Sequence, residues 1–489
     1  MREILREREF PIKEIQPGIY LRPCTAPAVL KLRMGPNACT MRTMEIPFIQ
    51  GLPVLGSAIE FQRDPLAFLR KHEARHPDLF GFRVGPNTLY FSNNADYAQH
   101  ILFKNFKNYG KQNLMYREMA ILFGGATSVV DGDRWKAGHE MIKPSLAMKR
   151  VTEFLPIIEK SFEDMLTSWE KHAATGEAAD ASADLAAATM SIIVNTMFGS
   201  NMPDDPELIG RSFRDILGII VDRILSVVKF PLAVPTPQNL RYRRAIASID
   251  GFIYRIIDEK LRSQGEPAGF QDILGEWIES LGSAAESSRK RLRDEVIGIF
   301  VAGHGSSATF LSWIFYHLAT QPEIQEEVAN ELRGVLGGRT PEAADAGRLP
   351  LTRAVIEESM RLTPPGWVIS RSTIAEDTLG PYRLPPNSMV LLSPYLLQNS
   401  PRYWERPEAF DPRRFLHRGD GFPANAYIPF TTGPRVCTGK SLAMMEATML
   451  LAQTLRKYRL ALKPGHRITP EGGFTLNLKG GLLLQLTRR

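Results

Sequence analysis

The stretch Phe430-Thr-Thr-Gly433-Pro-Arg435-Val-Cys437-Thr-Gly439 is the most informative part of this 489-residue chain. Gly433 permits a tight turn where a side chain would clash, and Arg435 can reach a carboxylate. The apolar stretch that follows is typical of a helix, and a thiolate at the start of a helix is stabilised by free N–H groups and the helix dipole. Gly439 leaves room for a flat macrocycle. The stretch indicates a loop that presents the Cys437 thiolate to haem, or else a buried structural cysteine.

A second pattern precedes this loop. Glu358 and Arg361 are three residues apart on an amphipathic segment, so they share one face of a helix. Arg414 follows in a Pro-Arg-Arg-Phe stretch. The three side chains can form a buried network of balanced charge, which holds a local geometry and is costly to break. E-x-x-R alone is most often a solvated helix pair, but the three patterns in this order are far more specific.

Taken together, the three patterns resemble the cytochrome P450 family, in its bacterial type that carries neither a membrane anchor nor a fused reductase. The resemblance covers about residues 46–489 and implies a mainly α protein with a small β region, the cytochrome P450 fold. It also implies that Cys437 ligates the iron of haem b as a thiolate.

Other segments resemble further parts of that family's site. Residues 300–309 are similar to the oxygen-binding part of its long central helix, and Asp131 to Trp135, with His139, to the helix that holds the haem propionates. Arg371 resembles the propionate-binding arginine after the first sheet strand. The resemblance implies a haem site formed by Trp135, His139, Ala302, Gly303, Arg371, Phe430, Gly433, Arg435 and Gly439.

The central segment departs from the family. Gly305 and Ser306 stand where the family usually has an acid and a threonine, and His139 stands where an arginine is more usual. We expect Ser306 and Gly305 to be the catalytic pair, with a bound water or a substrate group replacing the absent acid. The alternative is that Ser306 bonds back to its own helix. Gly303 and Gly305 suggest close approach of something flat, with plain helix packing as the alternative.

The resemblance also implies a substrate pocket whose residues are mainly apolar, which suits a hydrophobic small molecule but does not choose between terpenoid, polyketide, fatty acid and aromatic. Lys111 and Arg117 offer partners for a carboxylate, although loop charges are usually solvated. Phe230 and its neighbours, beside Lys229, either dip into a membrane surface or pack over the pocket. The expected pocket residues are Leu114, Met115, Phe123, Trp367, Val368, Ile369, Phe474 and Leu476.

Composition limits the alternatives. The length permits two or three domains, but the resemblance implies that residues 46–489 form one P450 domain. Residues 1–45 would then be an arm. Either the arm is disordered or the translation start has been placed too early. The 60 basic and 53 acidic residues give a net charge of +7. The basic residues do not form a tract, so we expect no nucleic-acid partner. Three cysteines are too few for a disulfide framework, and a free thiolate fits the cytoplasm. The sequence contains no run of about 18 apolar residues, so we expect no transmembrane segment.

We therefore expect a haem-thiolate monooxygenase that inserts one oxygen atom from O2 into an apolar small molecule, as in secondary-metabolite biosynthesis. It would act as a monomer, with electrons from a separate ferredoxin or flavodoxin and its reductase. One alternative is a P450-fold enzyme that couples phenols, desaturates or rearranges a peroxide. Another is a haem-binding sensor without turnover. Candidate cations for steering an acidic electron donor are Arg134, Lys136, Lys143, Arg435 and Lys440.

Overall fold

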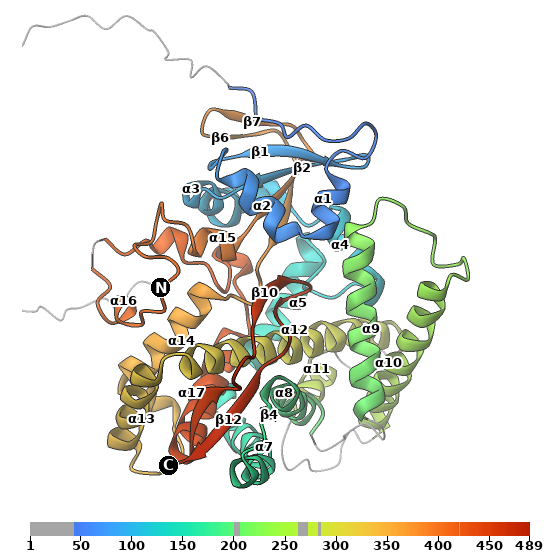
Figure 1. The fold of residues 1–489 in the computed structure, drawn as a ribbon. Coiled ribbons are helices and arrows are strands. Elements are labelled where there is room, and N and C mark those ends of the chain that lie inside the picture. Colours follow the sequence, from blue (N-terminus) through green and yellow to red (C-terminus); the bar gives the residue numbers. More distant parts are fainter. Residues whose placement is uncertain (1–43, 200–205, 263–271, 282–284, 420) are drawn as a thin grey trace, which may run out of the picture. The chain divides into compact units, whose positions relative to one another are not determined.

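The computed structural model describes residues 44–199, 206–262, 272–281, 285–419 and 421–489. The expected N-terminal arm therefore lies outside the described residues, apart from its last two positions. The segment Thr43–Arg489 forms one compact unit. It is mainly helical with a small β region, which confirms the predicted fold class (Figure 1).

The helices and strands have the following bounds. The α-helices are α1 (Ala58–Arg63), α2 (Pro65–Glu73), α3 (Ala95–Gln99), α4 (Leu114–Phe123), α5 (Gly132–Ser145), α6 (Met148–Glu153), α7 (Leu155–Thr175), α8 (Ala181–Phe198), α9 (Pro206–Leu225), α10 (Pro237–Arg262), α11 (Ile273–Leu281), α12 (Ala285–Ala319), α13 (Pro322–Leu336), α14 (Pro350–Leu362), α15 (Pro394–Gln398), α16 (Arg413–Leu416) and α17 (Lys440–Lys457). The strands are β1 (Phe80–Val84), β2 (Asn87–Ser92), β3 (Tyr109–Gly110), β4 (Ala179–Asp180), β5 (Ile369–Thr373), β6 (Asp377–Leu379), β7 (Tyr382–Leu384), β8 (Met389–Leu392), β9 (Tyr458–Leu462), β10 (Thr469–Gly472), β11 (Leu476–Lys479) and β12 (Leu483–Arg488).

The largest sheet positions one of the predicted site residues. Its strand order is β1-β2-β8-β5-β3, in which β2 and β8 run parallel and the other neighbours are antiparallel. Every residue of β5 is buried, and Arg371 pairs with Val390 of β8, the central strand of the sheet. The Arg371 backbone is therefore held by the ladder rather than by a mobile loop.

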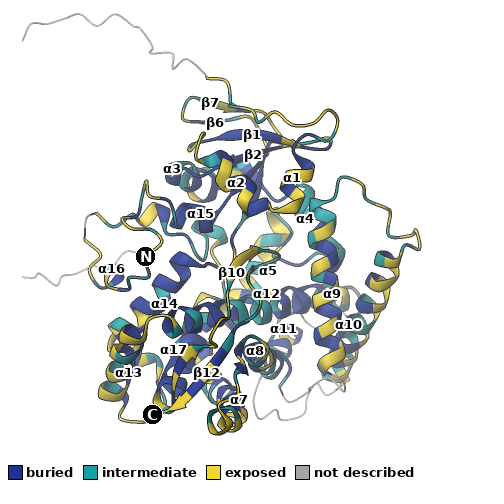
Figure 2. Cartoon of the chain, in the orientation of Figure 1, coloured by how far each residue is buried: buried dark blue, intermediate teal, exposed yellow. Residues whose placement is uncertain are grey.

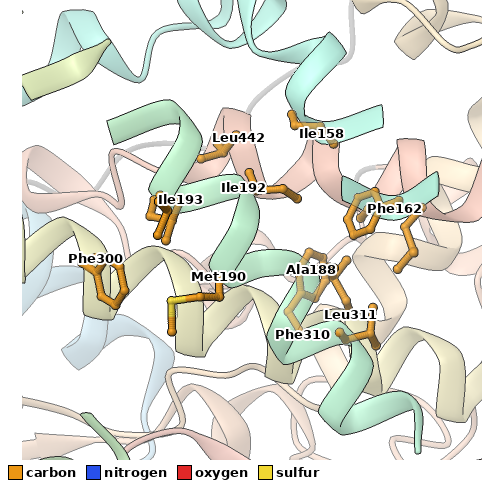
Figure 3. Close-up of a cluster of buried hydrophobic side chains, with 14 of the residues drawn as sticks. Ile158, Phe162, Ala188, Met190, Ile192, Ile193, Phe300, Phe310, Leu311 and Leu442 are labelled. Carbon is orange, nitrogen blue, oxygen red and sulfur yellow. The ribbon is translucent and has the colours of Figure 1, made fainter. Parts of the chain in front are cut away.

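The core is built around α12, which is apolar on most of its circumference because it is surrounded by other helices. Figure 3 shows Ile192, Ile193 and Met190 of α8 beside Phe300 and Phe310 of α12. In Figure 2 the buried residues gather where α8, α12, α14 and α17 meet, and exposed ones lie on the outer faces of α7, α10 and α13. This core carries the central segment that the sequence singled out.

Two helices are long and apolar enough to cross a membrane by length and composition, Ala181–Phe198 and Ser288–Ala319. The sequence had suggested no such segment, because charged and polar residues interrupt both runs. Their most apolar windows are 61% and 67% buried inside the protein. Core helices satisfy the same criterion, and these two pack against each other within the core.

Candidate functional site

A cavity of about 430 Å³ brings together residues from both halves of the chain. It runs from the Cys437 loop, past α5 and α12, to the sheet and to the C-terminal end of α9. Cys437 lies in its wall together with most of the side chains predicted to hold haem. The predicted haem-site residues that line the cavity are Trp135, His139, Ala302, Arg371 and Arg435.

The Cys437 loop is fixed by its own backbone. The N–H of Cys437 donates to the carbonyl of Phe430 at 3.0 Å, while the Phe430 ring packs on the core and does not line the cavity. Gly433 has a φ of 78°, and a Cβ there would lie 2.2 Å from the Leu102 carbonyl oxygen in a π-helical turn. The glycine is therefore required for close packing of the loop.

The environment of the thiol suits a metal ligand. Cys437 has an accessible surface, but that surface faces the cavity, and burial raises the pKa of its thiol above the ordinary value. The N–H groups of Gly439 and Lys440 and the Lys440 charge act in the opposite direction. A bound metal ion displaces a thiol proton outright, so these donors at the start of α17 would stabilise the thiolate. A Cβ on Gly439 would be 3.8 Å from the sulfur, an ordinary contact, so no clash within the protein requires this glycine.

Buried cations gather on one side of the cavity. The Arg371 Nη1 donates to the Tyr116 hydroxyl at 2.7 Å and to the Ser370 carbonyl at 2.8 Å. Arg435 pairs with Asp131 at 2.6 Å, but its buried Nε has no partner among the described residues. Since Asp131 is already paired, this side of the cavity has an excess of positive charge, which fits the two carboxylates of a haem.

Lys111 belongs to the same cluster, although the sequence suggested it only as a partner for a substrate carboxylate. It is 7% exposed and its Nζ donates to the Thr127 carbonyl at 3.0 Å. Burial lowers the pKa of Lys111 to about 7, and the nearby Arg371 charge acts in the same direction. An anion in the cavity would therefore restore its charge. No sequence signal separates this lysine from a solvated loop lysine, because only the packing of 110–127 buries it.

Trp135 and His139 add two polar groups to the cavity wall. The indole N–H of Trp135 is a hydrogen-bond donor, and the imidazole of His139 can donate or accept. Their rings stack one turn apart on α5, with centroids 5.3 Å apart, and neither ring nitrogen has a partner in the described part of the chain. Burial lowers the pKa of His139, so a neutral imidazole faces the cavity. These unpartnered groups, together with the cations, fit the propionates of a haem lying against Cys437.

Gly303, in the central segment of α12, lies against helix α8 and not against the cavity. A Cβ on Gly303 would lie 2.7 Å from Ile193 Cδ1 of α8 (Figure 3 shows Ile193 there), and the residue does not line the cavity. Helix packing, which was the alternative, accounts for this glycine, and its assignment as a haem contact stays a prediction. Ala302 does line the cavity. Close approach of α8, rather than of a flat ligand, explains the glycine.

Gly305 and Ser306 occupy adjacent positions on this segment. No atom lies within 4 Å of a Cβ built on Gly305, so there is space beside it. The Ser306 hydroxyl donates to the carbonyl of Ala302. This bond back to its own helix is the alternative arrangement for Ser306, and it places the hydroxyl on the face of α12 that contains Ala302.

The structure also brings Glu358, Arg361 and Arg414 together. Arg361 makes two bonds to the Glu358 carboxylate, at 2.8 and 2.9 Å, and Arg414 Nε makes a third at 3.1 Å. The side chains of Glu358 and Arg361 are fully buried. Arg361 further donates to the carbonyls of Gln398, Pro407 and Ala409. The network therefore fixes the long segment that leads toward the Cys437 loop.

Most of the expected substrate residues line the cavity: Leu114, Met115, Trp367, Val368, Ile369 and Phe474. Two do not, and this corrects the sequence assignment. Phe123 lies behind Phe474, with the two rings stacked at 6.2 Å, and Leu476 is fully buried in a core cluster. The assignment failed because the hairpin and α4 each present one face to the cavity and another to the core.

Several further residues of the cavity have no signal in the sequence. They come from α1, α2, β1, β2 and β8, and their apolar character is the same as that of ordinary core residues. These residues are Phe61, Pro65, Leu69, Val84, Leu89, Met389 and Leu391. Val221, Ile224 and Leu225 of α9 also line the cavity, and they lie in the region 213–235 that the resemblance places at the pocket.

A buried carboxyl group on α17 was also missed. Glu446 is 2% exposed and accepts a hydrogen bond from the Ser307 hydroxyl of α12 at 2.6 Å, with no cation paired to it among the described residues. Burial raises the pKa of Glu446 to about 7. The group thus joins the helix that follows the cysteine to the central helix.

Glu446→Gln should change how stability depends on pH. The folded protein holds this proton more tightly than the unfolded chain, so the free energy of unfolding should fall as pH rises from about 4.5 to about 7 and level off above that. The rise in the Glu446 pKa from 4.5 to about 7 on folding corresponds to about 3 kcal/mol of unfolding free energy. The wild type should lose this free energy as pH rises, and the glutamine variant should not. Denaturant unfolding of the holoenzyme between about pH 5 and pH 8 measures this.

Ser307→Ala provides the matched comparison. The Ser307 hydrogen bond lowers the Glu446 pKa, so its removal should extend the decline in stability to higher pH and make the total loss larger. Equal pH dependence in the wild type and Glu446→Gln would show that this carboxyl does not control the effect.

Comparisons with known proteins agree with this geometry. The sequence profile of the family described as Cytochrome P450 matches residues 46–484. Cyclooctat-9-en-7-ol 5-monooxygenase from Streptomyces melanosporofaciens is 30% identical over 423 residues, which cover 85% of this chain and 89% of that protein. Cyclooctatin synthase from the same organism is 29% identical, covering 87% and 92%. Pentalenene oxygenase from Streptomyces avermitilis is 25% identical, covering 90% and 96%.

The family match extends over nearly all of the described residues and includes the thiol, the cation cluster and the central helix. The relatives that cover most of their own length are oxygenases by name. The chain therefore belongs to the cytochrome P450 family and is a P450 monooxygenase of secondary metabolism.

Proposed function

We propose that this enzyme inserts one oxygen atom from O2 into an apolar small molecule, using haem b ligated by Cys437. The observation that carries the proposal is the apolar cavity of about 430 Å³ that reaches the thiol. A pocket with this lining suits a hydrophobic ligand. Thiolate-ligated haem supplies the cleavage of the O–O bond, and the protein supplies orientation and protons.

The substrate we propose is a cyclic hydrocarbon or an alcohol derived from one. The charged lining residues gather mainly around the cation cluster, where propionates would occupy them. The rest of the lining is largely apolar and offers few partners for a charged substrate. The names of two relatives specify cyclooctat-9-en-7-ol and pentalenene, which are molecules of this chemical kind.

We assign the propionates to Arg371, Arg435 and Lys111, with Trp135 and His139 as additional partners. Each lines the cavity, and together they supply more donors than the protein itself satisfies. Burial of these cations favours an anionic partner, because an unpaired buried charge is costly. These residues would hold a haem in the part of the cavity that Cys437 and Ala302 also line.

On α12 we assign proton delivery to Ser306 and to a water beside Gly305. The space next to Gly305 has room for a water, with the Ser306 hydroxyl and helix carbonyls as its partners. A glycine cannot donate a proton itself. The water would therefore take the place of the acid that most family members have there.

Ser306→Ala should divert reduced cofactor into peroxide while product falls. Because its hydroxyl bonds to Ala302, we expect a loss smaller than the ~10²-fold that a directly positioned donor contributes. Gly305→Asp should change the same coupling, since the side chain has space. Product per reduced cofactor and peroxide are the quantities to measure. Ser312→Ala is the matched control, because Ser312 makes the same kind of bond to its own helix but lies further along α12 from Ala302, which lines the cavity.

Electrons would come from a separate ferredoxin or flavodoxin. The exposed cations that we assign to its docking surface are Arg134, Lys136, Lys143 and Lys440. Arg435 is withdrawn from that set, because it is partly buried and paired with Asp131. Attraction between this surface and an acidic donor would speed their association and weaken with salt. We further propose a monomeric, cytoplasmic enzyme.

Labelled O2 tests the reaction itself. The holoenzyme, a ferredoxin with its reductase and a candidate cyclic hydrocarbon should give a product containing one labelled oxygen atom. The absence of an acid at Gly305 favours a second candidate, a reaction that desaturates or rearranges the substrate. Turnover with no label in the product would support that candidate and exclude hydroxylation of the tested substrate.

A further inference from the structure

A buried carboxyl group on α12 has no part in the chemistry assigned so far. Glu295 lies about two turns before Ala302 on this helix, lines the cavity and is 3% exposed. It makes no ion pair with the described residues, whereas the neighbouring Asp294 pairs with Lys290 and Arg293. Burial raises the pKa of Glu295 above its ordinary value. A carboxyl group is costly to bury without a cation, so the groups that it binds should show what it contributes.

The Glu295 carboxyl group binds Thr127, in the connection between α4 and α5. The Thr127 N–H is shared between the two carboxyl oxygens at 3.1 and 3.0 Å, and the Thr127 hydroxyl donates to Oε1 at 2.8 Å. Helix α5 packs directly over this pair, because a Cβ on Gly138 would lie 1.7 Å from Thr127 Oγ1 and 3.0 Å from Glu295 Oε1. Thr127 is therefore fixed between α12 and α5.

Thr127 in turn binds Lys111 of the cation cluster. Its carbonyl accepts a hydrogen bond from Lys111 Nζ at 3.0 Å, and the backbone N–H of Lys111 donates to Asp131. The ammonium lies 5.8 Å from the centre of the Tyr116 ring, whose hydroxyl accepts a bond from Arg371. A continuous series of contacts therefore runs from α12 through Thr127 to the cations that face the cavity.

We propose that Glu295 is a positioning residue that acts through Thr127 to hold the Lys111 ammonium within reach of a haem propionate. The inference rests on the proposed function, in which Lys111 binds a propionate. A free lysine side chain occupies many rotamers, and a fixed acceptor restricts its ammonium before haem binds, which lowers the cost of binding. Both Thr127 donors reach Oε1, so this role requires the acceptor oxygen of Glu295 and not its charge.

A double-mutant cycle on haem dissociation tests this, with apomyoglobin capturing the haem released by the holoenzyme. Lys111→Met removes the ammonium and should raise the dissociation rate about tenfold. Glu295→Met keeps the length of the side chain but accepts no such hydrogen bond, and it should raise the rate by a similar factor. The double variant should release haem about as fast as Lys111→Met alone, because both changes act through one ammonium; independent effects would instead multiply to about a hundredfold.

Two milder variants separate position from charge and from folding. Glu295→Gln keeps an acceptor oxygen for both Thr127 donors, so its dissociation rate should stay within about twofold of the wild type. Thr127→Val removes the hydroxyl bond and leaves the backbone N–H and carbonyl in place. It should raise the rate by about threefold, and this rise should vanish when residue 111 is methionine. The valine variant keeps the test available if Glu295→Met is insoluble.

Asp294→Ala is the matched control. Asp294 is also buried on α12 and binds the same connection, through the Gly125 N–H at 2.8 Å, but the carbonyl that accepts from Lys111 belongs to Thr127. Any effect of Asp294→Ala on haem dissociation should therefore multiply with that of Lys111→Met. Each variant should retain the absorption band of the thiolate-ligated ferrous–CO complex, which reports an intact iron ligand.

Three results would overturn the inference: multiplying effects of Glu295→Met and Lys111→Met, a Glu295→Gln variant that releases haem as fast as Glu295→Met, or equal coupling of Lys111 to Asp294, which would assign the effect to the whole connection. An unchanged rate in Lys111→Met would remove the propionate assignment of Lys111 together with this inference. Turnover without label from O2 would count against the proposed reaction alone and leave the result of the cycle intact.

Discussion

Cys437→Ser should abolish the red-shifted absorption band of the ferrous–CO complex and all oxygenation. Serine is nearly isosteric, and the N–H groups of Gly439 and Lys440 that point at the sulfur remain available. A hydroxyl does not ionise readily to donate electron density to iron as a thiolate does. The protein should still fold, because the backbone bond from residue 437 to Phe430 and the Gly433 packing do not involve the sulfur.

The measurement is the CO difference spectrum of purified variant and wild type at equal haem content. Thr438→Ser, at a neighbouring position that also lines the cavity, is the control and should keep the band. A Cys437→Ser variant that retained the red-shifted band would exclude this residue as the iron ligand.

Glu358→Ala should yield apoprotein or insoluble protein. The change leaves the fully buried Arg361 guanidinium without its carboxylate and removes a partner of Arg414. Breaking a buried pair in this way costs about 3–5 kcal/mol, a large share of the 5–15 kcal/mol that typically stabilises a folded protein. The Asp411 N–H, which donates to Glu358 at 2.9 Å, loses its acceptor too. The segment before the Cys437 loop should therefore lose its fixed position.

Soluble yield, haem content and the midpoint of denaturant unfolding are the observables. Glu327→Ala is the matched control, because Glu327 pairs with Arg413 on the surface, with side chains 45% and 56% exposed. Such an exposed pair contributes about 0–1 kcal/mol, so this variant should resemble the wild type. A stable, haem-loaded Glu358→Ala protein would contradict a structural role for the network.

Local sequence signals were sufficient for several parts of this protein. The spacing of Glu358 and Arg361 on one helix, the glycine before the cysteine and the apolar circumference of α12 are consequences of helix periodicity and backbone sterics. Such constraints act within a few residues, so they are visible in the chain itself. The mainly helical P450 fold and the position of the cysteine could be predicted from them.

Whether a given side chain faces the cavity or the core could not be predicted from such local signals. Gly303 faces α8 and Gly305 faces open space, although both lie in one helical turn. Phe123 and Leu476 are as apolar as the cavity residues near them, yet each packs into the core. Which face of an element meets the cavity depends on where the neighbouring elements lie.

The amino-acid sequence by itself determined the family, the iron ligand it implies and the helix that crosses the core, because those signals are local and ordered along the chain. Only the tertiary structure decided that Lys111 and Glu446 are buried, with pKa values of both shifted to about 7. It also brought Gly56 and Val227, which are far apart in the sequence, to the same β1–β2 hairpin. Burial and long-range proximity arise from packing between distant segments, and the composition of one segment does not encode them.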